Sequence, residues 1–418
     1  MTERPAPQRR FHALLAALLL GLGSFALFAW RIGQPAAVYF DETHYVPAAR
    51  ALITHGGPVN IEHPLFAKTM IAAGILLFGD NSLGWRLPSA FLGSISIAAV
   101  FWIALMMFQK VRPAVLTALL VVFDQTFFIQ ARIAMLEMPM TACVLLAAGC
   151  LMQGARASAG GRRWDYAGAV LLGLAVGSKW LAIPYAALFF AASGWSKSRA
   201  HAHEAGAIID HVLPDVAKLG LVSVLTYLAT FWPAFFYTHD AMTPGHLLGF
   251  QFEMLHAQSG HMQAHPYQSD WWQWPLMLRP MWYLFEKVNG RYEAVLLIGN
   301  PVIYWGGLII AAVAASGWLR RRSVQLQAAL GVYVFSLAVW ILIPKQIGFF
   351  YYYNSSAIAL CLVIASFLES HGRRGVRVLT WFTALSGAMF IYFYPIISAQ
   401  SLPADDTWTG WVWMKSWY

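Results

Sequence analysis

Long apolar runs separated by short polar intervals follow one another along almost the whole chain. The first run occupies residues 11–30, and a helix of about 20 apolar residues can cross the roughly 30 Å hydrocarbon core of a bilayer. Arg4, Arg9 and Arg10 precede this run. Because the run is longer than the apolar core of a signal peptide and no small-residue cleavage site follows it, we expect a retained helix with its N-terminus inside.

The same criterion predicts ten further spans. They are expected near residues 87–108, 114–129, 133–152, 219–236, 294–318, 324–343, 349–368 and 376–395, with two short spans inside 166–195. The interval 166–195 is divided because one long helix would bury Lys179 in the hydrocarbon core. Residues 68–78 are apolar but too few to cross, which predicts a re-entrant or interfacial helix. A short interfacial helix is also expected over residues 47–54, ended by the Gly-Gly-Pro sequence that follows.

Composition agrees with a polytopic membrane protein of the all-α class. Of the 418 residues, 59% are hydrophobic and 11% are charged, whereas a soluble domain has roughly 25% charged residues. The net charge of +9 fits basic cytoplasmic loops and lipid headgroups, and no basic segment interleaved with aromatic residues indicates nucleic acid. The distribution of Lys and Arg predicts eleven spans with a cytoplasmic N-terminus and an extracytoplasmic C-terminus. The three cysteines lie in apolar runs and are expected to pack there.

The first polar interval, residues 38–70, is rich in ionisable side chains. They are Asp41, Glu42, His44, His63 and Lys68. Charges at a membrane boundary are costly, so this set favours a functional interpretation. Neighbouring carboxylates can supply a general base, while a His and a Lys can hold a phosphate. An ordinary interfacial loop stays the alternative, because acidic pairs are common on protein surfaces.

Five cations are expected on the outer side of the membrane, where they can stabilise a phosphate leaving group. They are Lys68, Arg86, Arg132, Lys179 and Arg279. Any one of them could instead extend to lipid headgroups, and Arg132 could pair structurally with Glu137. Their grouping near one membrane face favours a shared anion site over five separate anchors.

The second large outer interval, residues 237–292, is rich in Trp and His. Its histidines are His239, His246, His256, His261 and His265. Only His261 and His265 are four residues apart, so a divalent metal stays an alternative to the expectation of no cofactor. The aromatic run at residues 271–274 fits an interfacial belt and is also compatible with sugar stacking.

Several stretches, in order along the chain, resemble the protein O-mannosyltransferases of the GT-C glycosyltransferase superfamily. They are Phe40–Tyr45, His63-Pro64 with Lys68, Trp85–Pro88, Gln130–Ile133 with Glu137, Ser178–Trp180, His265–Tyr267, Trp274–Leu276 with Leu278–Pro280, and Gly299–Trp305. The chain departs from the family pattern in two ways. One changes the packing residues of a motif, and the other indicates the bacterial branch of the family. The family's His-Pro-Pro-Leu-Gly-Lys reads His-Pro-Leu-Phe-Ala-Lys at residues 63–68, and residues 237–292 are too few for the β-trefoil MIR domain of eukaryotic members.

The resemblance implies a GT-C fold with one catalytic domain over residues 1–418, a first outer loop over 31–86, a second over 237–292 and no MIR domain. It implies transfer of mannose from a polyprenyl phosphate to Ser or Thr of exported proteins by one inverting displacement. Asp41 would act as the general base, and Glu42 would orient the acceptor or its neighbour. The matching stretches supply the remaining site candidates, which are His63, Glu137, His265, Tyr267, Trp274 and Asn300.

Two alternatives stay open. A related transferase could place another sugar, such as aminoarabinose, on lipid A or a cell-wall glycan. A membrane transporter is disfavoured because the charges gather at one face and no repeat is visible. The expected setting is the bacterial inner membrane, with the active site on the extracytoplasmic face. The expected partners are a polyprenyl-phosphate sugar donor, an exported protein and membrane lipids, with no nucleic acid; association with the secretion translocon or an oligomer also stays open.

Overall fold

A computed structural model describes residues 7–157, 161–200, 206, 208–260, 264–317, 323–343, 347–402 and 406–418. The described part holds seven helices long and apolar enough to cross a bilayer: Arg10–Ala29, Ser82–Phe108, Glu137–Arg156, Ile208–Phe236, Val324–Leu342, Phe350–Glu369 and Gly372–Ile397. Shorter apolar helices lie at Phe66–Phe78, Val111–Val122 and Val302–Ser316. The expected helical, multi-pass membrane protein is thus confirmed. Eleven spans and their orientation stay predictions, and Arg4, His261 and Arg320–Arg322 lie outside the described residues.

The chain forms two compact units whose segments alternate in sequence. Unit 1 consists of Met1–Phe40, Val100–Arg132 and His261–Tyr418, and unit 2 consists of Asp41–Ala99 and Ile133–Gly260. The long helix α4 (Ser82–Phe108) contributes residues to both. The predicted division into one catalytic domain with two outer loops stays a prediction.

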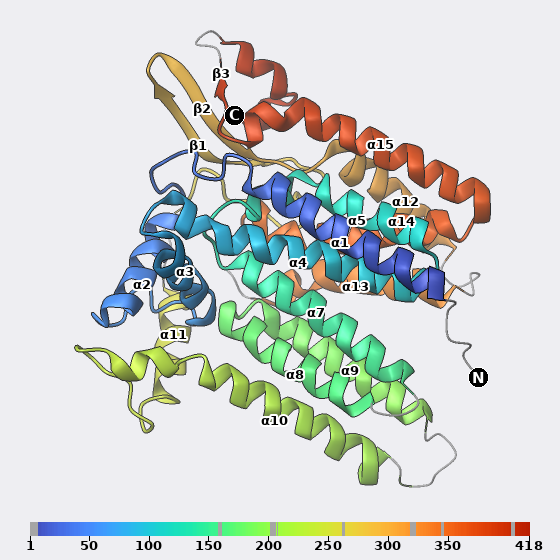
Figure 1. Cartoon of the computed structure of the whole chain (residues 1–418), viewed down its shortest axis with the longest axis horizontal. Coiled ribbons are helices and arrows are strands. Elements are labelled where there is room, and N and C mark those ends of the chain that lie inside the picture. Colours follow the sequence, from blue (N-terminus) through green and yellow to red (C-terminus); the bar gives the residue numbers. More distant parts are fainter. Residues whose placement is uncertain are drawn as a thin grey trace. The chain divides into compact units, whose positions relative to one another are not determined.

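Unit 2 is helical throughout its described residues. Its elements are α2 (Glu42–Thr54), α3 (Phe66–Phe78), the first part of α4, α7 (Glu137–Arg156), α8 (Gly161–Ser178), α9 (Ala182–Ala200), η1 (Ile208–Val212), α10 (Leu213–Ala229), η2 (Trp232–Phe236) and α11 (Gly249–Ser259). Helix α8 packs between α7 and α10 (Figure 1). Helices α8 and α10 approach closely at Gly173 because glycine has no side chain. A Cβ atom there would lie 2.4 Å from the Ser223 carbonyl oxygen.

The sequence located most of these helices. The short apolar helix expected over residues 68–78 is α3, and the expected break around Lys179 separates α8 from α9. Helix α2 begins earlier than the expected residue 47, because Pro47 sits inside the helix instead of starting it. Helix α4 likewise begins at Ser82 rather than near residue 87, so Arg86 belongs to the helix.

Unit 1 combines helices with a small sheet. Its elements are α1 (Pro7–Ala29), the second part of α4, α5 (Val111–Val122), α6 (Gln125–Gln130), β1 (Met281–Val288), β2 (Arg291–Leu297), η3 (Val302–Gly306), α12 (Gly307–Ser316), α13 (Val324–Leu342), η4 (Phe350–Tyr353), α14 (Asn354–Glu369), α15 (Gly372–Ile397), β3 (Ser401–Leu402), η5 (Asp406–Trp411) and η6 (Lys415–Trp417). Helix α14 packs against α5, α12, α13 and α15. Most of its side chains are buried.

The sheet is an addition to the helical fold that the hydropathy pattern did not predict. Strands β1, β2 and β3 are antiparallel in that order, with Met281 opposite Leu297 and Tyr292 opposite Leu402 (Figure 1). Asn289 and Gly290 connect the first two strands, both with positive φ, and an Asn-Gly pair of this kind is the strongest short-range hairpin signal. The span expected over residues 294–318 therefore starts later, at η3.

The span expected over residues 114–129 is also divided in the structure. Helix α5 ends at Val122, and the side chain of Asp124 caps α6 by accepting a hydrogen bond from the Thr126 amide at 3.3 Å. Asp is a preferred N-cap residue because its carboxylate satisfies the first free amides of a helix. A polar residue inside an apolar run thus marks a helix boundary here.

Candidate active site

Asp41 lies at the start of α2, directly after an unusual backbone turn. Phe40 has a φ of 51°, in a region that costs a non-glycine residue on the order of 1–3 kcal/mol. Asp41 itself is half-buried and its side chain does not cap α2, in contrast to Asp124 at α6. The two aspartates at helix starts thus differ in whether the side chain caps the helix.

Glu42 and Arg86 form a fully buried ion pair within unit 2. The Arg86 Nε and Nη2 atoms donate to the two carboxylate oxygens of Glu42 at 2.7 and 2.8 Å, and neither side chain is exposed. The amide of Ala134 donates to the same carboxylate at 2.9 Å. Three donors thus hold Glu42 in place, which suits a positioning role better than proton transfer. The predicted phosphate role of Arg86 is disfavoured by this geometry but stays a prediction.

Glu137 and Lys179 form a second buried pair. Glu137 heads α7, Lys179 occupies the break between α8 and α9, and the Lys179 Nζ atom donates to the Glu137 Oε1 atom. Among the described residues, the Glu137 Oε2 atom is buried without a hydrogen-bond partner. The sequence placed Glu137 beside Arg132 as an alternative, whereas the structure gives it Lys179 as its ion-pair partner.

Lys68 is completely buried near the start of α3. Its Nζ atom donates to the main-chain oxygens of Asn60 and His63, the latter at 2.7 Å. Burial lowers the pKa of Lys68 to about 7, although the nearby Glu62 carboxylate opposes that shift. Lys68 therefore stabilises the loop before α3 through these hydrogen bonds, in addition to any role of its charge.

His63 and Lys68 line one cavity of about 280 Å³ in unit 2. Tyr237, His246 and Glu253 contribute to its wall. His246 lies 2.7 Å from Glu253 through its Nε2 atom, and burial raises the pKa of Tyr237 to about 12. The cavity places the two sequence-predicted residues in one largely apolar pocket with several polar side chains in its wall.

Arg132 follows α6 in unit 1 and contacts the end of α1. Its Nη1 atom donates to the main-chain oxygens of Phe28 and Trp30, at 2.7 and 2.6 Å. The guanidinium also lies over the ring of Phe128, 5.0 Å from its centre. A cation at the C-terminal end of a helix stabilises its last carbonyl groups. These carbonyls are neutral, so the two bonds hold the guanidinium without cancelling its charge.

Asn300 and Trp274 are both buried in unit 1, and their side chains donate hydrogen bonds to other residues of that unit. The Asn300 side-chain amide donates to the main-chain oxygens of Phe123 and Ser386, both at 2.9 Å. Trp274 donates through Nε1 to the Ser269 hydroxyl at 3.0 Å. The Asn300 contacts join distant segments of the fold, whereas the Trp274 contact is local. Roles of Asn300 and Trp274 toward a substrate stay predictions.

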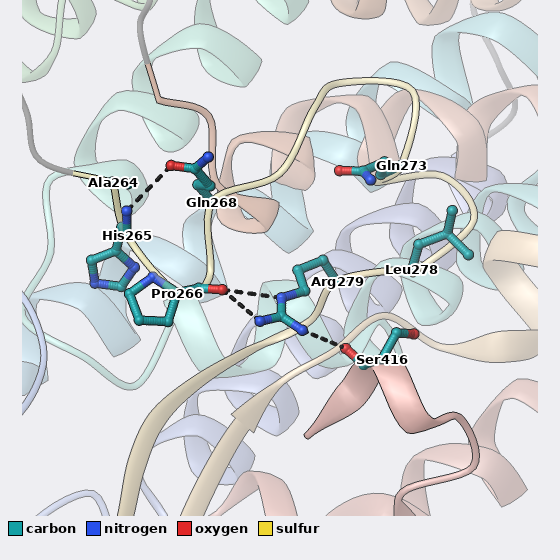
Figure 2. A pocket seen from close by; sticks show the side chains of 8 residues that line it. All are labelled: Ala264, His265, Pro266, Gln268, Gln273, Leu278, Arg279 and Ser416. Atoms are coloured by element: carbon teal, nitrogen blue, oxygen red, sulfur yellow. Dashed lines mark hydrogen bonds between the residues drawn. The ribbon is translucent and has the colours of Figure 1, made fainter.

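His265 and Arg279 line an open cleft of unit 1 (Figure 2). Arg279 donates to the Pro266 main-chain oxygen through Nε at 3.2 Å and through Nη2 at 2.6 Å. Its guanidinium lies 5.9 Å from the centre of the Tyr267 ring. The His-Pro-Tyr and Leu-Arg-Pro stretches, separated in sequence, are therefore brought together.

Two polar residues of this cleft were not singled out from the sequence. Gln268 and Gln273 line it together with His265 and Arg279 (Figure 2). Gln273 lies within the aromatic run at residues 271–274 and Gln268 directly follows the His-Pro-Tyr stretch, and these positions could have identified them.

The structure groups the predicted residues in pairs within each unit. Among the described residues, no group of three or more His, Cys, Asp or Glu side chains lies close enough to hold a metal ion. The expectation of no cofactor stays a prediction, and His261 of the suggested histidine pair lies outside the described residues.

The comparisons with known proteins concern almost the whole chain. The family model described as dolichyl-phosphate-mannose-protein mannosyltransferase matches residues 18–238. A second, described as the C-terminal four TMM region of protein O-mannosyltransferase, matches residues 245–417.

Two bacterial relatives carry the name polyprenol-phosphate-mannose–protein mannosyltransferase. The protein of Mycobacterium tuberculosis is 28% identical, over 90% of this chain and 86% of that protein. The protein of Mycolicibacterium smegmatis is 26% identical, over 96% of this chain and 92% of that protein. The fold is also similar to a chain of the Saccharomyces cerevisiae protein O-mannosyltransferase Pmt1-Pmt2 complex bound to the sugar donor. That match has a TM-score of 0.81 and 13% identity, and covers 95% of this chain and 91% of the other.

Proposed function

Because the chain belongs to the dolichyl-phosphate-mannose-protein mannosyltransferase family, we propose that it transfers mannose from a polyprenyl phosphate to Ser and Thr hydroxyls of exported proteins. The chief support is that two named protein mannosyltransferases align with at least 90% of this chain. The observation in the site that fits this chemistry best is Asp41. Asp41 is half-buried at the start of α2, next to Glu42, which is held by Arg86.

In the proposed step, the acceptor hydroxyl loses its proton to the carboxylate of Asp41. The freed oxygen attacks the anomeric carbon of mannose, a new oxygen–carbon bond forms, and the bond from that carbon to the phosphate oxygen breaks. The polyprenyl phosphate leaves with the bonding electrons, and the configuration at the anomeric carbon inverts. A correctly placed base of this kind typically contributes 10²–10⁴-fold to a rate. Glu42 supports the step by fixing the start of α2.

The phosphate leaving group needs a cation, and the geometry orders the five candidates. Arg86 and Lys179 are bound to carboxylates, and Lys68 is buried against main-chain oxygens. Arg132 and Arg279 are held by carbonyl groups, which leave a guanidinium's charge in place. We therefore assign the phosphate to Arg132, and a phosphate role of Arg279 stays a prediction from the sequence.

The proposed setting is the bacterial inner membrane, with Asp41, Lys179 and Tyr418 on the extracytoplasmic side and Arg162 on the cytoplasmic side. The loop charges support this orientation. Single-cysteine variants labelled in intact cells with an impermeant maleimide test it. Labelling at position 162 but not at 41 would reverse the orientation. Association with an oligomer or the secretion translocon stays a prediction of the same kind.

The test of the function uses purified full-length protein in lipid nanodiscs. We expect consumption of polyprenyl-phosphate mannose to match, mole for mole, a mass increase on Ser or Thr of an exported protein. EDTA should not slow the reaction if no metal takes part. Sugar found only on lipid A or a glycan would instead favour the aminoarabinose-transferase-like alternative, and no donor consumption would contradict enzymatic transfer.

A further inference from the structure

The open cleft of unit 1 combines apolar side chains with several hydrogen-bond donors. Its volume is about 760 Å³, and the described residues that line it include no acidic side chain. Figure 2 shows Gln268, Gln273 and Arg279 around one open space, with Ser416 at its edge. A cavity of this size is within the usual range for binding sites, roughly 300–1,000 Å³.

The two amides have a fixed orientation. The Gln268 Oε1 atom accepts from the His265 amide at 3.2 Å, and the Gln273 Oε1 atom accepts from the Asp270 amide at 2.7 Å. Since each side-chain oxygen is held by a main-chain N–H group, each NH₂ group is left to donate elsewhere. Within the described part of the chain, neither NH₂ group has a hydrogen-bond partner.

His265 adds a third donor of the same kind. Its Nδ1 atom accepts a hydrogen bond from the Tyr267 amide at 3.2 Å. A neutral imidazole that accepts at Nδ1 carries its proton on Nε2, so the ring offers an N–H group at its other side. Arg279 is the only cation among the described residues that line the cleft.

The cleft already binds main-chain carbonyl groups of the protein itself. Arg279 donates to the Pro266 oxygen, and through Nη1 to the oxygen of Ser416 at 3.4 Å, in the C-terminal segment (Figure 2). A phosphoryl site would be expected to gather several cations or a helix N-terminus, whereas here three neutral donors accompany one arginine. The arrangement suits a ligand that presents several neutral acceptors.

We propose that this cleft binds the main-chain carbonyl groups of an extended segment of the acceptor polypeptide. The proposal rests on the proposed function, because it identifies how a protein acceptor is held. Recognition through the main chain makes acceptor binding largely independent of sequence. Gln268 and Gln273 then set the affinity for longer acceptors without touching the reacting atoms.

The test replaces the two amides by carboxylates. In the Gln268→Glu/Gln273→Glu protein, each side-chain oxygen can still accept its main-chain hydrogen bond, but the NH₂ donors are lost and negative charge faces the peptide carbonyls. We expect the KM for an eight-residue Thr-containing peptide to rise about 10-fold or more. The KM for N-acetyl-threonine methylamide and for polyprenyl-phosphate mannose should stay within about twofold. Gln325→Glu, an exposed glutamine of α13, is the matched control and should behave as wild type.

Three outcomes overturn the proposal: an unchanged KM for the long peptide, an equal rise for the short acceptor, or a rise for the donor instead. The last result would make the cleft a phosphate site. If the wild-type protein transferred no mannose to any peptide, the proposed function would fail separately. Equilibrium binding of the fluorescein-labelled eight-residue peptide to both proteins still decides the cleft, since equal affinities would contradict it.

Discussion

Two buried cations of unit 2, Arg86 and Lys179, are satisfied differently from the buried Arg132 of unit 1. In unit 2, Arg86 is paired with Glu42 through two bonds, and Lys179 is paired with Glu137. In unit 1, Arg132 is held by the neutral main-chain oxygens of Phe28 and Trp30. Removing Arg86 or Lys179 leaves a buried carboxylate, whereas removing Arg132 leaves carbonyl groups at a helix end. We therefore expect Arg86 and Lys179 to stabilise the fold, and Arg132 to take part in the reaction as well.

The largest effect on stability is expected from Arg86→Ala. It leaves the Glu42 carboxylate buried without its fork of donors, which should cost about 3–5 kcal/mol. Thermal unfolding in detergent measures the loss. Arg50 is the matched control because it makes the same two-bond fork to Asp80, at 2.8 and 3.0 Å, with both side chains 45% exposed. Arg50→Ala should cost no more than about 1 kcal/mol. Equal losses in the two variants would show that burial does not distinguish these pairs.

Arg132→Ala should affect turnover more than folding. If the guanidinium contacts the charge that develops on the phosphate, transfer falls by roughly 10²-fold. The loss of folding stability should be smaller than for Arg86→Ala, because helix-end carbonyls can be hydrated. Initial rates at saturating donor, together with a melting curve on the same sample, separate the two effects. A folded Arg132→Ala protein with wild-type transfer would remove Arg132 from the mechanism and favour Arg279.

A different kind of effect is a pH dependence of stability that originates at Lys68. Burial holds its pKa in the folded protein at about 7, below the 10.5 of an exposed lysine. Between these values the unfolded chain binds more protons, so stability should rise with pH, by at most about 1.4 kcal/mol per pH unit. Melting temperatures of wild type and Lys68→Met between pH 7 and 9.5 test this. The slope should be lower in Lys68→Met, and identical slopes would assign the pH dependence to other groups.

The hydropathy pattern predicted most of the helices. The site residues were predicted only as residue types, without their contacts. Apolar runs located α1, α3 and α13, and the lysine in the run at 166–195 located the break between α8 and α9. The hairpin of β1 and β2 was missed because hydropathy over long windows conceals a short Asn-Gly turn. Its turn chemistry was present in the sequence nonetheless.

The partners of the site residues depend on tertiary contacts that spacing does not encode. Arg86 meets Glu42 from 44 positions away, and Arg132 meets the end of α1 from more than a hundred positions away. From the sequence, both arginines were equal candidates for a phosphate. Both are buried, and the identity of their hydrogen-bond partners distinguishes them.

The central claim is that Asp41 is the base that accepts the proton of the acceptor hydroxyl, and one measurement tests it most directly. Asp41→Asn keeps the shape of the side chain but cannot take up a proton at neutral pH. Single-turnover transfer at saturating polyprenyl-phosphate mannose should fall by roughly 10²- to 10⁴-fold, with donor affinity measured on the same sample almost unchanged. Glu42→Gln, as the neighbouring control, should slow transfer less. A folded Asp41→Asn protein that binds donor and transfers mannose at nearly the wild-type rate would contradict the account.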